Sequence, residues 1–239
     1  MKPAVTLAET TLPGGTTLSL IEHDGEFYLQ SDGIQLQSTF AHGAVEELAR
    51  LACAPFQSAR QPRLLFAGLG LGYTLAAARA ALPQKRAAFV VAEPLPDLPA
   101  WHRSFLGNLH PGQLDDPRLD IRSQTLAAVL KKAPQGFQVI LLDTESSPRL
   151  EGVTDRNGLL RSSFLNRAHS ALKEGGLLAV RCSLDPASIE RRLRQAGFDV
   201  AHESVPASHK GKQKRRSTIW LARKGTYQPR SVKHPDRTT

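Results

Sequence analysis

The feature that most constrains this chain of 239 residues is a glycine-rich turn between two apolar segments. Residues 64–67 have the pattern of a short buried strand, and residues 73–82 are typical of an alanine-rich helix. Between them lie Gly68, Gly70 and Gly72. Glycine at these positions permits positive φ and lets the backbone approach a ligand closely. A strand, a tight turn and a helix in this order predict the first unit of an open α/β sheet, with the turn as a ligand cradle.

Strand and helix patterns continue to alternate after this turn. Because strands that alternate with helices of this length pair in parallel, the pattern predicts a Rossmann-like, doubly wound and mostly parallel sheet. The expected strands are 88–92, 119–122, 137–142, 177–182, 198–205 and 217–222, and the expected helices are 126–132, 161–172 and 186–196.

A small β element precedes the sheet. An Asp24-Gly25 turn signal joins two short strand patterns into a hairpin, and a third strand pattern and a short helix follow. We therefore expect an N-terminal β-hairpin element and helix over 1–60, a Rossmann-like domain over 61–224 and a disordered basic tail over 225–239. The strand patterns are 17–21, 26–30 and 34–37, and the helix is 44–52.

The net charge of +9 is confined to the end of the chain. Residues 1–205 hold 21 basic and 21 acidic side chains, whereas residues 206–239 hold ten basic side chains and one acid. Cys53 and Cys182 stand in apolar runs with no metal-ligand spacing, which favours a reducing compartment without disulfide or zinc. With no apolar stretch at the N-terminus, we expect a cytoplasmic protein that does not enter a membrane.

An acid follows the glycine turn at the spacing that a nucleoside site needs. Glu93 ends the second strand, 21 residues after Gly72, where a carboxylate can accept both ribose hydroxyls. A dinucleotide fingerprint would require a third glycine where this chain has Tyr73, so NAD binding is disfavoured.

With these motifs, the chain resembles the spermidine synthase-like branch of the class I S-adenosylmethionine-dependent methyltransferase superfamily. The resemblance implies a seven-stranded sheet and S-adenosylmethionine or its decarboxylated form as cofactor, bound by Gly68, Gly70, Gly72, Glu93 and Asp143. It is also compatible with a homodimer. The matching segments are 32–35, 65–72, 91–93, 115–119, 139–143 and 172–178.

Several positions depart from the family pattern. Asp143 matches the first carboxylate that faces an amine substrate, but Ser146 takes the place of the second. The tyrosine-histidine pair of the family is missing from the first helix. Glu145 could supply the second acid because its longer side chain reaches the same space. Where relatives hold adenine with an aspartate, this chain has Thr125, preceded by Gln124, and either side chain can still form a hydrogen bond to the base.

Asp143 and Glu145 are therefore the catalytic candidates, as groups that orient or deprotonate an acceptor. For Asp143, an equally good interpretation is a carboxylate that caps the turn after the strand.

The loop 210–216 contains five lysines and arginines in seven residues. In this fold it opens on the ligand-binding side, where it would repel a diamine and attract a phosphate-rich partner such as RNA. A solvated surface loop accounts for it equally well, so RNA contact is permitted rather than indicated.

The sequence thus predicts a transferase of methyl or aminopropyl groups, with the small-molecule or nucleic-acid acceptor unknown. The alternative is a catalytically silent nucleoside-binding or RNA-associated protein of the same fold.

Overall fold

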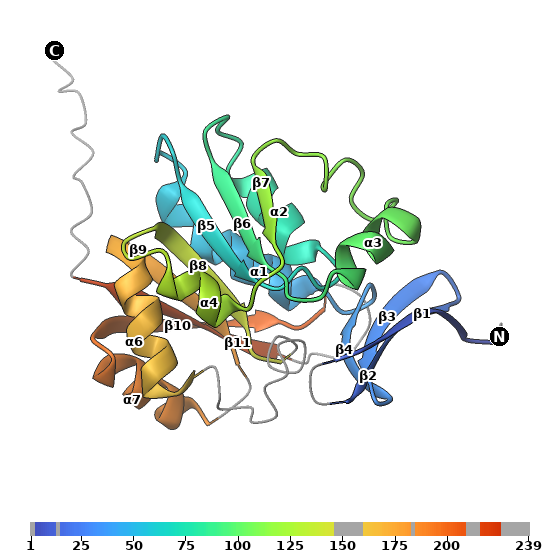
Figure 1. Cartoon of the computed structure of the whole chain (residues 1–239). Helices are drawn as coiled ribbons and strands as arrows, with labels where there is room; N and C mark the ends of the chain where they lie inside the picture. Colours follow the sequence, from blue (N-terminus) through green and yellow to red (C-terminus); the bar gives the residue numbers. More distant parts are fainter. Residues whose placement is uncertain (1–2, 13–14, 146–159, 183–184, 209–215, 226–239) are drawn as a thin grey trace, which may run out of the picture.

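Seven strands form the central sheet of the protein, in the order β10-β11-β9-β8-β5-β6-β7 (Figure 1). The computed structural model describes residues 3–12, 15–145, 160–182, 185–208 and 216–225. The strands are β5 (Arg63–Ala67), β6 (Ala88–Ala92), β7 (Leu119–Arg122), β8 (Phe137–Asp143), β9 (Leu172–Arg181), β10 (Phe198–Pro206) and β11 (Arg216–Lys224).

Five of these strands pair in parallel with one another, and β5 lies at their centre. It pairs in parallel with both β6 and β8, while β7 extends the β6 side and β9 extends the β8 side. The chain first builds outward through β6 and β7 and then returns to the other side of β5, so the strand order reverses beside β5. Ligands of open α/β sheets bind at such a reversal, beyond the carboxyl ends of the strands.

The far edge of the sheet is antiparallel. β11 pairs antiparallel with both β9 and β10. Hence β10 runs parallel to the five central strands, as the sequence predicted. The mostly parallel, seven-stranded sheet expected from the sequence is confirmed.

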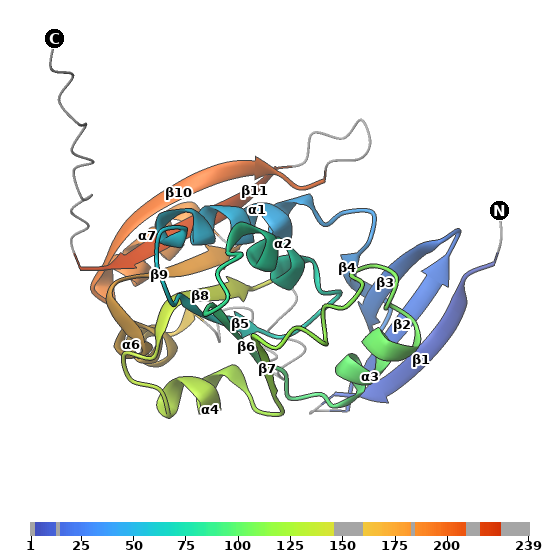
Figure 2. The same ribbon diagram turned by 90° about the horizontal axis from the view of Figure 1, so that it is seen from above.

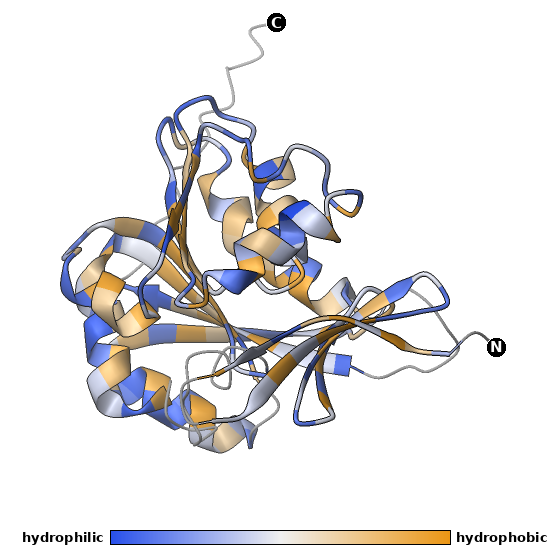
Figure 3. Cartoon of the chain, turned by 45° about the vertical axis from the view of Figure 1, so that its right-hand side comes forward, coloured by the Kyte–Doolittle hydropathy of each residue, from blue (hydrophilic) through white to orange (hydrophobic). Residues whose placement is uncertain are grey.

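Helices cover both faces of this sheet, because successive side chains of each strand point to opposite faces (Figure 2). In β8, Val139 and Leu141 pack under α1 (Gly43–Cys53) and α2 (Tyr73–Ala81). Ile140 and Leu142 pack on the opposite face. The helices of that face are α4 (Leu126–Lys131), α6 (Ser162–Ala171) and α7 (Pro186–Gln195). Long hydrophobic stretches accordingly run along strands in the interior of the molecule (Figure 3).

A second, antiparallel sheet stands at one end of the molecule. It is a meander of β1 (Val5–Thr11), β2 (Thr17–His23), β3 (Glu26–Ser31) and β4 (Ile34–Ser38). Its inner face packs on α3 (Asp97–Ser104), and Thr10 Oγ1 donates to Asp97 Oδ2 at 2.7 Å. The N-terminal element is thus anchored on the segment that follows Glu93.

Three local predictions were incomplete. β1 was not expected, because its residues are mostly exposed and lack a clear alternation. α3 was not expected because Pro94, Pro96 and Pro99 interrupt the pattern, yet proline is tolerated at the start of a helix. Residues 173–176, which lie between the expected helix 161–172 and the expected strand 177–182, instead belong to β9, where the pairing with β8 shifts register and Gly175 has a φ of 73°.

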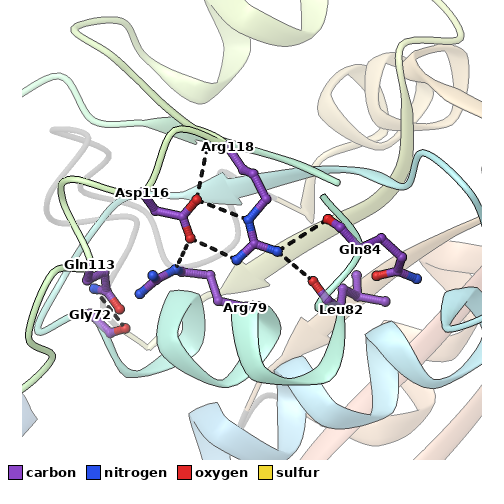
Figure 4. Close-up of polar contacts among 7 residues, drawn as sticks. All are labelled: Gly72, Arg79, Leu82, Gln84, Gln113, Asp116 and Arg118. Atoms are coloured by element: carbon purple, nitrogen blue, oxygen red, sulfur yellow. Dashed lines mark hydrogen bonds and ion pairs between the residues drawn. The ribbon is translucent and has the colours of Figure 1, made fainter. Parts of the chain in front are cut away.

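A partly buried ion cluster ties the C-terminal end of α2 to the start of β7 (Figure 4). Asp116 accepts from Arg118 NH2 at 2.8 Å and from Arg79 Nε at 2.6 Å. Arg118 NH1 donates in turn to the carbonyl of Leu82, which follows the last residue of α2. Hydrogen bonds from Arg118 and Arg79 hold the pKa of Asp116 well below its usual range. This cluster fixes the helix that begins at the glycine turn.

We expect Asp116→Asn to lower the free energy of unfolding by about 2 kcal/mol at neutral pH, because two guanidinium groups lose their anion. Since the pKa of Asp116 is depressed in the folded state, its contribution is present at neutral pH and is lost as the pH falls below the ordinary aspartate range. Urea unfolding at about pH 7 and about pH 3 measures both effects.

Asp120→Asn is the matched control. Asp120 also pairs with an arginine, Arg122, but its side chain is 52% exposed, so its loss should cost less than about 0.5 kcal/mol. Equal losses for the two variants would contradict the role given to Asp116.

Candidate functional site

The site lies where four parallel strands end at the same edge of the sheet. The glycine turn follows β5, Glu93 follows β6, Thr125 stands after β7, and Asp143 is the last residue of β8. The topology therefore brings together residues that are up to 75 positions apart in the sequence.

The glycine turn has the backbone that the sequence predicted. The φ angles of Gly68, Gly70 and Gly72 are 85°, 53° and 87°, all in the left-handed region that favours glycine. Gly72 is the N-cap of α2, so the turn delivers the positive end of a helix to the sheet edge.

Gln37 of β4 lies directly against this turn. Its Oε1 accepts from the backbone N–H of Leu71 at 2.7 Å. A β-carbon built on Gly70 would stand 2.7 Å from Gln37 Nε2 and 2.9 Å from Gln37 Cδ. A side chain at position 70 would therefore have to displace the end of the Gln37 side chain, in addition to adopting a strained positive φ.

Gly72 is enclosed in the same way from the α3 side. His102 Nε2 donates to the carbonyl of Gly70 at 2.8 Å, and Gln113 Nε2 donates to that of Gly72 at 3.3 Å. A β-carbon on Gly72 would lie 2.9 Å from His110 Cδ2. Burial lowers the pKa of His102, and burial together with the neighbouring basic groups lowers the pKa of His110 to about 4.

Glu93 is almost completely enclosed, with 1% of its surface exposed. Its Oε2 accepts from Leu69 N at 2.9 Å and its Oε1 accepts from Leu95 N at 3.0 Å. Burial raises the pKa of Glu93 to about 7, against the lowering effect of these two bonds. Each oxygen retains a further lone pair for a hydroxyl donor.

Thr125 is the N-cap of α4. Its hydroxyl accepts from Ala128 N at 3.3 Å, and the residue is exposed. The oxygen therefore has a structural partner, while its proton can still be donated to a ligand. The assignment of Thr125 to the adenine base stays a prediction.

Asp143 caps the following turn and also pairs with Arg181, which the sequence did not indicate as a site residue. Its Oδ1 accepts from Glu145 N at 3.1 Å, the contact expected of a capping aspartate. Arg181 NH2 lies 2.8 Å from Oδ1 and 2.9 Å from Oδ2. Glu145 is half-buried, and its charge helps to raise the pKa of Arg181. The structure thus gathers Asp143, Glu145 and Arg181 at the end of β8 and β9.

A small cavity lies between the glycine turn and Asp143. Its volume is about 20 Å³, enough for one water molecule and far below that of a nucleoside pocket. The described residues that line it include Gln37, Gly68, Gly70 and Asp143.

The residues present fit an S-adenosyl ligand once Gln37 moves. The side chain of Gln37 is flexible, and a ligand oxygen can take its place as the acceptor for the backbone N–H of Leu71. Beside Gly72, Gln113 Oε1 and His110 Nε2 are buried without a hydrogen-bond partner among the described residues. A polar ligand at this turn would satisfy such atoms.

Comparison with known proteins gives no match to a family model and no match to a curated protein. Solved structures do match. A spermidine synthase from Thermotoga maritima has a TM-score of 0.69 at 19% identity, covering 92% of this chain and 73% of that one. A spermidine synthase in complex with the transition-state analogue AdoDATO has a TM-score of 0.68 at 20% identity, covering 92% and 72%.

A methyltransferase from Geobacter sulfurreducens matches less closely, with a TM-score of 0.51 at 16% identity over 74% of this chain and 78% of that one. The chain therefore shares the Rossmann-like fold of these spermidine synthases and of this methyltransferase. The matches to spermidine synthases confirm, at the level of the fold, the resemblance that the sequence predicted.

Some predicted features lie outside the described residues. These are Ser146, residues 210–215 of the basic loop and the tail from residue 226. Of that loop, Arg216 is described: it begins β11, and its Nε donates to Ser204 Oγ at 2.8 Å. No helix in the described part of the chain is long and apolar enough to cross a bilayer.

The contact between Gln37 and Gly70 can be tested by a double-mutant cycle. Gly70→Ala should be destabilising because of both the positive φ and the clash with Gln37, whereas in a Gln37→Ala background only the first cost remains. We expect a coupling of about 1 kcal/mol in urea unfolding.

Gln35→Ala serves as the control, because Gln35 lies on the same strand and is exposed. It should show no coupling to Gly70→Ala. A Gln37 cycle with equally little coupling would rule out the close contact.

Proposed function

We propose that this protein is a transferase that binds S-adenosylmethionine or a close analogue at the carboxyl edge of the sheet and transfers a methyl or aminopropyl group. The observation that carries the proposal is the shared cavity, which both the glycine turn and Asp143 line. Glu93 is suited to the ribose and the turn to the amino-acid side of the ligand, and Asp143 stands at the next strand, where an acceptor would approach. The spermidine synthase solved with AdoDATO supports an S-adenosyl ligand in this fold.

Each residue would have a distinct part. Glu93 would accept the ribose hydroxyls, the turn at Gly68 to Gly72 would lie against the amino-acid side of the ligand, and Thr125 would reach the base. When bound, an S-adenosyl sulfonium supplies an activated carbon for in-line displacement. Asp143 and Glu145 would orient the acceptor, and positioning of this kind can supply much of the rate.

Calorimetric titration with S-adenosylmethionine, its decarboxylated form and S-adenosylhomocysteine tests the proposal. We expect binding by the wild type and a loss of about 10- to 100-fold in affinity for Glu93→Ala, because two charge-assisted hydrogen bonds disappear. Glu190→Ala, on the exposed face of α7, is the control and should bind as the wild type does. Failure of the wild type to bind any of the three compounds would refute the proposal.

Affinity should also depend on pH through Glu93. Its pKa of about 7 means that the carboxyl group is largely protonated in mild acid and ionised in mild base. Because hydroxyl donors favour the ionised form, affinity for S-adenosylhomocysteine should rise from about pH 6 to about pH 8 and then level off. The same titrations on Glu93→Gln should lack this rise, and an identical slope in both proteins would argue against ribose binding by Glu93.

The second candidate function is a catalytically silent protein of the same fold. The observation that favours it is the enclosure of the glycine turn by Gln37, His102 and Gln113, which accounts for Gly70 and Gly72 without a ligand. The titration separates the two functions, since a silent scaffold with a permanently filled turn would bind none of the compounds.

A further inference from the structure

Arg181 occupies a position next to the acceptor end of the site. It is the last residue of β9, and the parallel register pairs it with Asp143 at the end of β8. Both residues continue the row of side chains, Leu141 and Ala179, that faces α1 and α2. The sheet itself therefore places a guanidinium beside the carboxylate that lines the cavity.

The pair is close and largely withdrawn from solvent. Arg181 NH2 lies 2.8 Å and 2.9 Å from the two oxygens of Asp143, and the side chains are 16% and 9% exposed. The carbonyl of Arg181 also accepts from Thr144 N at 3.0 Å and Thr144 Oγ1 at 2.9 Å. These hydrogen bonds hold the turn after β8 against the end of β9, so the backbone segments that carry Asp143 and Arg181 are fixed relative to each other.

The guanidinium stays charged in this position. Burial alone would lower the pKa of Arg181, but the carboxylates of Asp143 and Glu145 outweigh it and raise the pKa overall. Among the described residues that line the cavity, Asp143 is the only acid. A ligand in the cavity therefore meets a carboxylate whose negative charge is already neutralised by Arg181.

The neutralisation of Asp143 by Arg181 affects the choice of donor, because the two alternative donors differ in the charge of their terminal groups. The decarboxylated donor ends in an ammonium group alone, whereas the intact donor ends in an ammonium and a carboxylate. A polyamine acceptor is likewise a cation. An uncompensated buried carboxylate attracts ammonium groups strongly, but an ion pair complements a zwitterion better than a lone cation.

We propose that Arg181 is a specificity-determining positioning residue, which acts through Asp143 to admit the zwitterionic intact donor and to disfavour the decarboxylated donor and polyamines. This inference rests on the proposed function, and it names methyl as the group transferred and an uncharged nucleophile as acceptor. In that transfer the lone pair of the acceptor atom forms the bond to the methyl carbon while the carbon–sulfur bond breaks. Sulfur keeps the electron pair and becomes a neutral thioether, and any proton on the acceptor passes to water.

The test is the ratio of dissociation constants for S-adenosylmethionine and its decarboxylated form, measured by calorimetry. We expect the wild type to prefer the intact donor by about tenfold or more, and Arg181→Gln to reverse the preference. In the double variant Arg181→Gln/Asp143→Asn, the increased affinity for the decarboxylated form should disappear. The carboxylate of Asp143, which Arg181→Gln leaves without its arginine, is absent from this variant. Arg194→Gln, an exposed arginine of α7 that pairs with Glu190, should keep the wild-type ratio.

The ratio separates specificity from folding, since a purely structural role would weaken both donors equally. If Arg181→Gln does not fold, Asp143→Asn replaces it and should widen the preference for the intact donor. A wild type that prefers the decarboxylated form, or a ratio unchanged in Arg181→Gln, overturns the inference while leaving the proposed function in place. Absence of binding to S-adenosylhomocysteine by every variant overturns the proposed function and this inference with it.

Discussion

The parallel hydrogen-bonded ladder of β5 with β6 and β8 is the constraint on which the rest of the structure depends. It brings the ends of three strands to one edge, and the chain reverses its winding direction beside the central one. Gly68, Glu93 and Asp143 become neighbours for this reason alone. The helices on both faces and the ion cluster at Asp116 hold that ladder and orient α2, so the glycine turn is presented at a defined place.

The glycine turn illustrates how a motif can have two physical causes. Glycines in such a turn are usually explained by the close approach of a ligand. Here the β-carbon positions of Gly70 and Gly72 are already taken by Gln37 and by Gln113 with its neighbouring imidazoles. The motif is therefore compatible with binding and with a closed scaffold. The distinction depends on how readily one flexible glutamine leaves the amide of Leu71.

Local signals explain how far the sequence could be interpreted. The strands of the central sheet, the glycine turn and the positions of Glu93 and Asp143 could be predicted, because hydrophobic period and glycine placement act over a few residues. α3 could not, since its prolines give the signal of a loop. The roles of Gln37 and Arg181 could not be predicted either. They bind Leu71 and Asp143, which lie 34 and 38 positions away in the sequence, and a polar residue near the end of a strand carries no local signal of its partner.

By itself, the sequence determined the class of fold and the residue types at its ligand edge, because apolar alternation and glycine turns have few structural solutions. Only the tertiary structure decided what those residues face. It pairs Asp143 with Arg181, places Gln37 against the glycine turn, and encloses Glu93 so that its pKa rises to about 7. The physical reason is that charge compensation and burial depend on which side chains meet in space, and the register of the sheet controls that meeting.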